Sequence, residues 1–278
     1  MVIVFGSINL DLVARVPAIP AAGETLLGTS FVTSPGGKGA NQALAARLCG
    51  ARVAMVGAVG HDAFADAALA NLAASGVDLT SVMRVADATG VALINVDAKG
   101  ENAITVIAGA NGHALASWVG DDALVPGTTL LMQLEVPMRE VGALAHRAKS
   151  RGARVVLNGA PAAVLPDGLL RDVDFLVVNE HEAAICVGQR AGVNVVRTLG
   201  ARGATMEWQG TRYSEAPSHV AVVDTTGAGD ALCGAFAAAL DRGVAPPDAL
   251  REGVRAGAVA CTHRGAQSSA APSGIAGG

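Results

Sequence analysis

Aromatic residues are scarce in this chain. They make up 3% of its 278 residues, although 51% are hydrophobic. Much of the apolar content is Ala and Val, which suits close packing of helices on a sheet. Gly, Asp, Asn or Arg interrupts every apolar run before it reaches the length of a membrane span. The N-terminus, MVIVFGSINLDL, lacks the basic flank and cleavage site of a signal peptide, so we interpret it as a buried first strand.

An excess of basic charge is also lacking. The chain has 20 Lys and Arg against 24 Asp and Glu, and its net charge of −4 gives no reason to expect a nucleic-acid partner. Its four cysteines lie far apart without metal-ligand spacing and among small apolar residues, which predicts free, buried thiols. They are Cys49, Cys186, Cys233 and Cys261. Together these features predict a cytoplasmic globular protein that acts on small molecules, with neither a nucleic-acid nor a membrane partner.

Several widespread catalytic motifs are absent. The sequence contains no G-x-x-x-x-G-K-[ST] and no G-x-G-x-x-G, which excludes a P-loop and a dinucleotide-binding turn of the usual form. It also has no HExxH and no G-x-S-x-G nucleophile elbow. If this protein handles phosphate, it does so by another route.

What the sequence does contain is an alternation of short β-branched runs and Ala-rich helical stretches. Near-continuous apolar strands between amphipathic helices predict an α/β fold, with a mostly parallel sheet covered by helices on both faces in three layers. Ligands are then expected beyond the carboxyl ends of the strands. The predicted strands are 2–7, 52–60, 128–135, 154–160, 174–180 and 193–200, and the predicted helices include 39–50, 62–76, 140–152 and 231–243.

Two segments break this alternation. Residues 12–35 hold prolines and show no helical period, and residues 88–108 read as two strands joined by a hairpin turn at DAKGEN. We expect them to form a small β-layer that acts as a lid, although an edge extension of the main sheet remains an alternative. The core domain then comprises 1–11, 36–87 and 109–278, and the Ser/Gly/Ala-rich tail from 267 ends the folded part.

The stretch TTGAGDALCG places one carboxylate, Asp230, directly after Gly227, Ala228 and Gly229 and before a helix. Backbone N–H groups of such small residues can form an anion-binding nest at a helix N-terminus. A carboxylate beside it could accept a proton from a hydroxyl nucleophile. Taken alone, the stretch is equally compatible with Asp230 as a helix cap.

Polar residues also stand at other predicted strand ends. Lys38 and Asn41 follow two glycines in PGGKGANQA, where the glycines permit close approach of the backbone to a ligand, or form a turn with a solvated Lys. Asn9 and Asp11 alternate in GSINLD, so both would face one side of an extended segment, unless they form an Asx-turn. Glu135 ends the apolar run LLMQLE.

Asn179 and Glu182 follow the buried strand in NEHE. An acid in this place could hold Mg²⁺ through water. An N-cap with an acid in the first helical turn is the alternative.

Seen together, GSINLD, GGKGANQA, MQLE, NEHE, TLGARG, DTTGAGD and RGAQSS resemble, in order, the signatures of the ribokinase-like (PfkB) carbohydrate kinases, and those of the ribokinases most closely. They run from residue 6 to residue 269. The resemblance implies a sugar kinase that uses ATP to phosphorylate the primary hydroxyl of a small sugar. Because the match to ribokinases is the best, the implied reaction is that of D-ribose to ribose 5-phosphate. The resemblance further implies Mg²⁺, a monovalent cation such as K⁺, and a homodimer formed through the lid.

The resemblance also implies a role for each matching residue. Asp230 would be the base, and the backbone of Gly227, Ala228 and Gly229 the anion hole. The residues implied to bind the sugar are Asn9, Asp11, Gly37, Lys38, Asn41 and Glu135; those near the nucleotide are Asn179, Thr198, Gly200 and Gly203. Glu182 would hold Mg²⁺ through water. The implied monovalent-cation site consists of Asp224, Thr226, Ala260, His263, Gly265 and Ser269.

The chain departs from the family pattern around the ATP site. It reads NGAPA at 158–162 where the family has Asn-Pro-Ala-Pro, and 183–198 holds too few residues for the usual helix. The stretch 251–262 shows no polar residue for the base, and the last helix of the family is not evident after 269. Besides a ribose kinase, two alternatives therefore stay open: a kinase for a nucleoside or another sugar, and a catalytically weakened sugar-binding protein.

Overall fold

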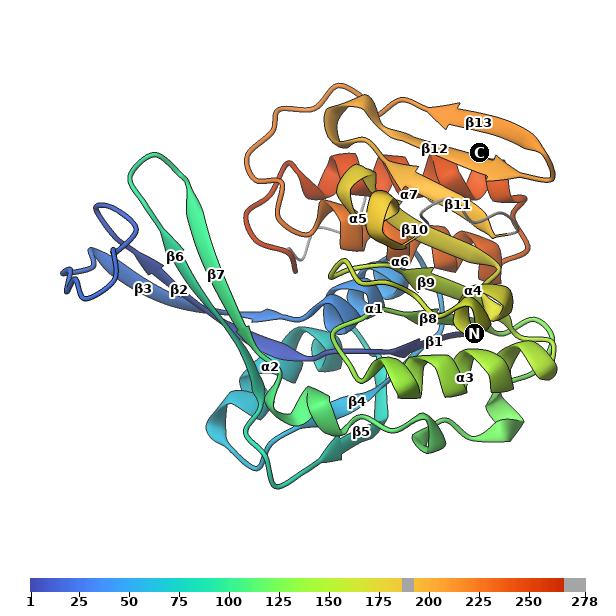
Figure 1. The fold of residues 1–278 in the computed structure, drawn as a ribbon, viewed down its shortest axis with the longest axis horizontal. Helices are drawn as coiled ribbons and strands as arrows, with labels where there is room; N and C mark the ends of the chain where they lie inside the picture. Colours follow the sequence, from blue (N-terminus) through green and yellow to red (C-terminus); the bar gives the residue numbers. More distant parts are fainter. Residues whose placement is uncertain (187–192, 268–278) are drawn as a thin grey trace.

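The computed structural model describes residues 1–186 and 193–267 (Figure 1). Its main sheet has nine strands in the order β13-β12-β11-β10-β9-β8-β1-β4-β5. All neighbours pair in parallel except β11 with β12 and β12 with β13. These strands are β1 (Val2–Phe5), β4 (Val53–Val59), β5 (Asp78–Arg84), β8 (Thr129–Met132), β9 (Arg154–Asn158), β10 (Phe175–Asn179), β11 (Asn194–Thr198), β12 (Ala204–Trp208) and β13 (Thr211–Glu215).

Helices cover both faces of this sheet, as the sequence predicts. The fully buried β1 shows why: Val2 and Val4 belong to one hydrophobic core, whereas Ile3 and Phe5 belong to another on the opposite face. The helices packed on the first core are α1 (Lys38–Leu48), α2 (Ala63–Ala74), α6 (Ala228–Asp241) and α7 (Pro246–Ala260); those on the second are α3 (Met138–Ser150), α4 (Asp167–Asp172) and α5 (Glu180–Cys186).

A second sheet, here called the lid sheet, projects from the core (Figure 1). Its four strands in the order β3-β2-β6-β7 are β3 (Ser30–Gly36), β2 (Asn9–Arg15), β6 (Gly90–Val96) and β7 (Asn102–Ile107). The β-layer is therefore separate, and the alternative of an edge extension of the main sheet is wrong. The predicted hairpin at DAKGEN is confirmed, because β6 and β7 pair antiparallel on either side of it. Since β2 begins at Asn9, the predicted sugar-binding segment is part of the lid sheet itself.

Short elements complete the described chain. Single 3₁₀ turns are present at Gly109–His113, Ala116–Trp118, Asp121–Ala123 and Gly200–Arg202. Between β10 and β11 the described residues form only α5, of seven residues, and the rest of the shortened connection (187–192) lies outside them. The absence of the last family helix likewise concerns residues beyond 267, outside the described part. No helix within the two described ranges is long and apolar enough to cross a bilayer.

Candidate active site

Ser7 and Glu135 join the exit of β1 to the start of α1. Glu135 Oε2 accepts hydrogen bonds from Ser7 Oγ at 2.5 Å and from the Lys38 backbone N at 3.1 Å. The sequence pattern places Glu135 at the end of a strand, but β8 ends at Met132 and Glu135 lies in the bend that follows. A carboxylate beside the first amides of a helix is favoured by the helix dipole. Glu135 therefore holds the start of α1 against β1.

Gly37 and Gly39 allow α1 to begin in contact with the backbone of residues 7–9. Gly37 has φ 87°, and a Cβ there would lie 2.7 Å from Asn9 N. A Cβ on Gly39 would lie 2.6 Å from Ser7 N. The sequence predicts a close backbone approach to a ligand at the consecutive glycines Gly36 and Gly37. The structure shows that Gly37 also lets the chain approach itself, and the approach of a ligand stays a prediction.

Asn9 and Asp11 lie two residues apart on β2, and therefore on one face of the lid sheet. Both belong to an extended strand, so the Asx-turn alternative is wrong. Asn9 is buried, and its Oδ1 accepts a hydrogen bond from Asn111 Nδ2 at 2.7 Å. Asn111 Oδ1 in turn accepts from Ile8 N at 2.8 Å. Asn111, which sequence analysis missed, thus holds the crossing from core to lid.

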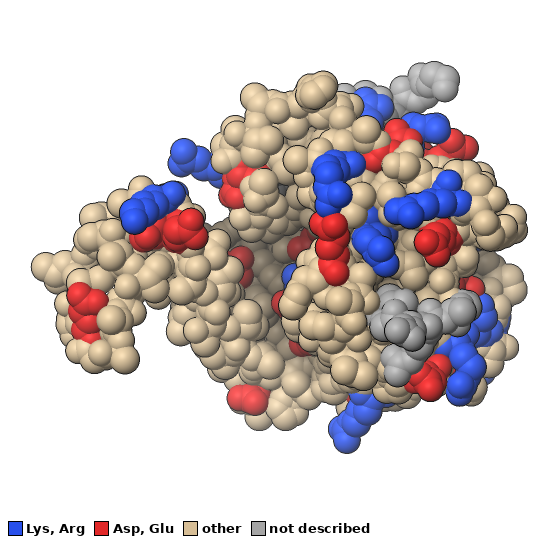
Figure 2. All heavy atoms as spheres, turned by 45° about the horizontal axis from the view of Figure 1, so that its top comes forward, with Lys and Arg blue, Asp and Glu red and all other residues tan. Residues whose placement is uncertain are grey.

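Charged groups from different elements gather at this crossing, where Figure 2 shows a hollow between the lid sheet and the core with acidic and basic side chains inside it. Burial raises the pKa of Asp11 to about 6, and the charges of Glu135 and Asp230 add to this effect. Burial alone would lower the pKa of Lys38, but the carboxylates of Asp230 and Glu135 outweigh it and raise the value. Glu182 also acts on Lys38, which is therefore no freely solvated lysine.

Asp230 lies in the first turn of α6, but it does not cap the helix. Gly227 is the N-cap residue, with φ 77°, and no side chain caps the helix by a hydrogen bond. The Asp230 carboxylate points instead to α1, where Oδ2 accepts from Asn41 Nδ2 at 3.0 Å and Oδ1 from Gln42 Nε2 at 2.8 Å. The helix-cap interpretation is therefore wrong. Burial raises the pKa of Asp230, against the lowering effects of Lys38 and of these two amide donors.

The loop before α6 is packed tightly on one side and open on the other. A Cβ on Gly227 would lie 2.6 Å from Ala266 Cα, so only glycine fits there. A Cβ on Gly229 would have no heavy atom within 4 Å. The Ala228 N–H donates to Thr225 O at 3.2 Å. The first turn of α6 thus presents its backbone on the side of Gly229.

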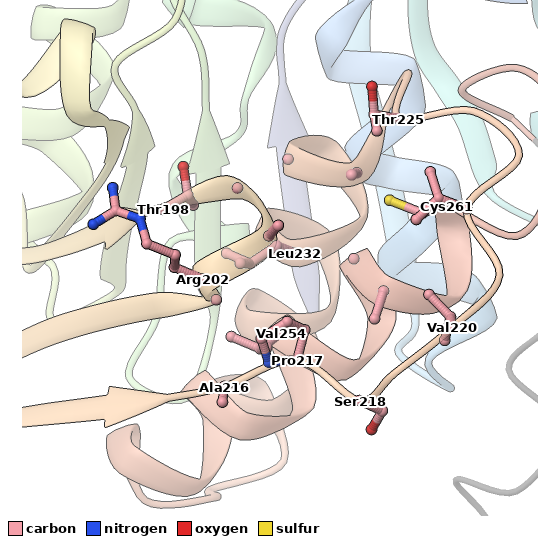
Figure 3. Close-up of a pocket in the computed structure, with 18 of the residues that line it drawn as sticks. Thr198, Arg202, Ala216, Pro217, Ser218, Val220, Thr225, Leu232, Val254 and Cys261 are labelled. Carbon is pink, nitrogen blue, oxygen red and sulfur yellow. The ribbon is translucent and has the colours of Figure 1, made fainter.

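That open side faces a cavity of about 600 Å³ between the β11–β12 turn, α6 and α7 (Figure 3). The predicted nucleotide residues Thr198, Gly200 and Gly203 line it together with Ala228 and Gly229. Asn179 is not among the described residues that line it. The walls from α6 and α7 are apolar, including Leu232, Val254 and Ala258. The cavity has the size and apolar character of a small-molecule site and ends at the helix N-terminus.

Asn179 and Glu182 form a capping box at the start of α5. Asn179 Oδ1 accepts from Glu182 N at 2.7 Å, and Glu182 Oε2 accepts from Asn179 N at 2.8 Å. The N-cap interpretation of this motif is confirmed. It leaves the role of Glu182 towards Mg²⁺ as a prediction, because a capping carboxylate still has free lone pairs on its other oxygen.

Asp224 connects the loop before α6 to the segment after α7. Its Oδ1 accepts from Thr226 N at 2.9 Å and from Thr226 Oγ1 at 2.7 Å, and its Oδ2 accepts from Gly265 N at 2.9 Å. These bonds lower the pKa of Asp224 against the opposing effect of burial. His263 N donates to Ala260 O at 3.2 Å in the same turn. Five of the six predicted monovalent-cation residues thus lie in two segments held together by Asp224; the sixth, Ser269, lies outside the described residues.

In the described part of the chain, no group of three or more His, Cys, Asp or Glu could hold a metal ion by itself. Mg²⁺ is usually bound through water, one or two carboxylates and substrate phosphates, and the assignment of Glu182 to it stays a prediction.

Comparisons with known proteins point to one family. The model of the pfkB family of carbohydrate kinases matches residues 1–273. Ribokinase from Haemophilus influenzae is 38% identical over 286 residues, covering 96% of this chain and 94% of the relative. A deoxyribokinase from Salmonella typhimurium is 34% identical, with coverages of 96% and 94%. The structure of Arabidopsis thaliana ribokinase complexed with ribose and ATP superimposes with a TM-score of 0.86 at 30% identity, covering 95% of this chain and 93% of the other. The chain is a sugar kinase and belongs to the pfkB family of carbohydrate kinases.

Proposed function

We propose that this protein transfers the γ-phosphoryl group of ATP to the primary hydroxyl of D-ribose, giving ribose 5-phosphate. One observation carries the proposal: the buried carboxylate of Asp230 follows Gly229, which lines the open cavity at α6, and it lies within electrostatic reach of Asp11, Lys38 and Glu135 at the lid crossing. Identity to ribokinases over nearly the whole chain supports ribose as the acceptor.

In this proposal Asp230 acts as the general base. The primary hydroxyl oxygen attacks the γ-phosphorus, the bond to the β-phosphate oxygen breaks, and the hydroxyl proton passes to the carboxylate. The backbone of Gly227, Ala228 and Gly229, at the positive end of α6, stabilises the charge that develops on the phosphoryl oxygens. The Ala228 N–H would exchange its long bond to Thr225 O for a phosphoryl oxygen.

We assign the residues that bind the two substrates to a ribose set and a nucleotide set. The ribose hydroxyls are held by Asn9, Asp11, Gly37, Lys38, Asn41 and Glu135. The nucleotide side comprises Asn179, Thr198, Gly200 and Gly203, and Glu182 would bind Mg²⁺ through water. When bound, Mg²⁺ screens the negative charge of the phosphates.

A K⁺ site formed by Asp224, Thr226, Ala260, His263, Gly265 and Ser269 is part of the proposal. It is supported by the bonds of Asp224 to both segments. The K⁺ ion would stabilise the loop that carries the anion hole. We also propose a cytoplasmic location, which suits an enzyme that consumes ATP and has four free cysteines.

A coupled ADP-release assay with ribose, deoxyribose, fructose and adenosine, with and without K⁺, tests this function. We expect ribose to give the highest kcat/KM and K⁺ to increase it. A preference for deoxyribose or adenosine would reassign the acceptor. Sugar binding by calorimetry without turnover of any acceptor would replace the kinase with the weakened sugar-binding protein.

Ribose binding is expected to weaken as the pH falls below about 6, the pKa of Asp11. The ionised carboxylate accepts hydroxyl hydrogen bonds, and below its pKa the sugar must compete with a proton. The folded protein binds this proton more tightly than the unfolded chain does. The free energy of unfolding therefore falls as the pH rises from about 4 to about 6 and Asp11 ionises. Calorimetric Kd values between pH 5 and 8 measure the effect.

Asp11→Asn is the control for this pH dependence. It should bind ribose more weakly at pH 7 with a flatter pH profile, and its gain in unfolding free energy over the wild type should be larger at pH 7 than at pH 4. A pH dependence that persists in the variant would exclude Asp11 as its source.

We further propose a homodimer formed through the lid sheet. Val32, Val13, Ile94 and Ile104 are paired across the four strands, so they form an apolar row on the same face as Asp11. Val32 and Ile104 are 58% and 54% exposed, and an apolar row of this kind marks a protein contact.

Ile104→Glu is therefore expected to give a monomer, whereas Thr105→Glu, on the opposite face of the same strand, should remain dimeric. Light scattering coupled to size-exclusion chromatography distinguishes the two. A monomeric wild type would contradict the proposal.

A further inference from the structure

Two side-chain amides of α1 donate hydrogen bonds to the carboxylate of Asp230, and the oxygen of each amide accepts a hydrogen bond from a further glutamine. Gln42 donates to Asp230 Oδ1, and Gln42 Oε1 accepts from Gln133 Nε2 at 2.7 Å. Asn41 donates to Asp230 Oδ2, and Asn41 Oδ1 accepts from Gln267 Nε2 at 3.0 Å. The two oxygens of the carboxylate thus end two separate chains of amides, here called the amide relays.

The relays extend beyond these residues and are shielded from solvent. Asn71 Nδ2 on α2 donates to Gln267 Oε1 at 3.2 Å, and the second hydrogen of Gln42 Nε2 goes to Asn158 Oδ1 at 3.1 Å. Gln42 and Gln133 are 0% exposed, and Gln267 is 8% exposed. Water therefore has little access to these amides, and it cannot easily replace a hydrogen-bond partner that a substitution removes.

The direction of both relays is set by Asp230. An ionised carboxylate only accepts hydrogen bonds, so Asn41 and Gln42 must turn their NH₂ groups towards it. Their oxygens then face away and require the NH₂ groups of Gln267 and Gln133. For Gln133 this orientation leaves Oε1 buried without a hydrogen-bond partner in the described part of the chain. An unsatisfied buried acceptor is unfavourable. The hydrogen bonds from Gln133 to Gln42 and from Gln42 to Asp230 are therefore kept at the expense of an unpaired oxygen on Gln133.

Close packing of α1 on α6 brings the first amides into reach. Gly234 lies one turn after Asp230 on the same face of α6. A Cβ at Gly234 would lie 2.5 Å from Gln42 O and 2.6 Å from Ala45 Cβ. Any other residue would push α1 away and separate the amides from the carboxylate. The relay geometry is therefore built into the contact between the two helices.

We propose that Gln42 and Gln267 are positioning residues that orient the Asp230 carboxylate for proton transfer through the two amide relays. The inference rests on the proposed function in that Asp230 is the base. One donor on each oxygen fixes the plane of the carboxylate and leaves the remaining lone pairs to the substrate hydroxyl. The same donors lower the pKa of Asp230 against the larger effect of burial, so they favour its ionised form.

Gln42→Met and Gln267→Met test the proposal, because Met keeps the length of the side chain without its hydrogen bonds. We expect kcat to fall by about 10- to 100-fold, as for a misplaced catalytic group. The calorimetric Kd for ribose, measured without ATP, should change much less. In Gln42→Met the loss of a donor to Asp230 should also move the acid limb of the kcat profile to higher pH by roughly one unit. Gln267→Met, which removes the partner of Asn41 and no direct donor to Asp230, should move it in the same direction by less.

Gln42→Glu should move this limb further than Gln42→Met, because it replaces a donor with a second carboxylate. The other charged or titratable groups that act on Asp230 remain in place in all these variants. They are Asp11, Lys38, Glu135 and Cys233. A residue with a purely structural role would change Tm but leave the limb unmoved.

Comparison with the wild type and with Asp230→Asn separates the possible failures. The proposed function stands if the wild type turns over ribose and Asp230→Asn does not. In that case, an unchanged kcat and an unmoved acid limb in the folded Gln variants would overturn only the inference about the relays. Absence of turnover in the wild type would overturn both. Circular dichroism and Tm establish folding, and if Gln42→Met does not fold, Gln267→Met at the far side of the site decides.

Discussion

Replacing Asp230 by Asn is expected to lower kcat for sugar phosphorylation by about 10²- to 10⁴-fold, the contribution of a positioned general base. Asn has the same size but cannot accept the hydroxyl proton. Ribose binding should change little, because Asp11 and Glu135 remain available to its hydroxyls. The measurement is kcat in the coupled ADP-release assay beside the calorimetric Kd for ribose. Retained turnover would exclude Asp230 as the base.

The same substitution is expected to raise Tm at pH 7. The pKa of Asp230 is raised by burial, so the ionised carboxylate costs stability once the pH exceeds its value in the unfolded chain. Asn removes the charge, and its side-chain oxygen can still accept a hydrogen bond from Gln42 Nε2 or Asn41 Nδ2. Asp230→Ala is the matched control: it leaves Asn41 and Gln42 without an acceptor and should lower Tm. An Asn variant less stable than the Ala variant would contradict this explanation.

Local patterns were sufficient to predict most of the fold. The apolar runs gave the central parallel strands, since a strand buried on both faces needs apolar residues at consecutive positions. The DAKGEN turn between two alternating runs gave the lid hairpin. The hairpin of β12 and β13 was missed because its turn residues, Gln209 and Gly210, are not a common turn pair. Both have positive φ (50° and 74°), so the turn has the geometry of an Asn-Gly turn without its sequence.

The site was predicted less completely, because residues that contact each other in it lie far apart along the chain. Motif order indicated Asp11, Glu135 and Asp230 as site residues, and the structure brings their charges within electrostatic reach of one another. Gln42 and Asp230 are 188 residues apart, and Asn41 and Gln267 are 226 apart. A glutamine in an Ala-rich helix carries no local sign of such a partner. Only the packing of α1 on α6 shows that the acid is held by amides rather than placed as a cap.

Gly229→Val is expected to lower kcat/KM for ATP by about 10²-fold, the loss associated with one group that stabilises a developing anion, while Tm stays near that of the wild type. A side chain at Gly229 meets no protein atom within 4 Å and enters the cavity that we assign to the nucleotide. The Kd for ribose should be unchanged, since Gly229 lines the cavity assigned to the nucleotide and no residue of the lid sheet is among the described residues that line it. Gly227→Val, two residues earlier, is the control with the opposite pattern. Its φ of 77° and the contact with Ala266 predict a clear loss of Tm. If Gly229→Val bound and used ATP as the wild type does, the triphosphate would lie elsewhere, and the anion hole at the start of α6 would have to be abandoned.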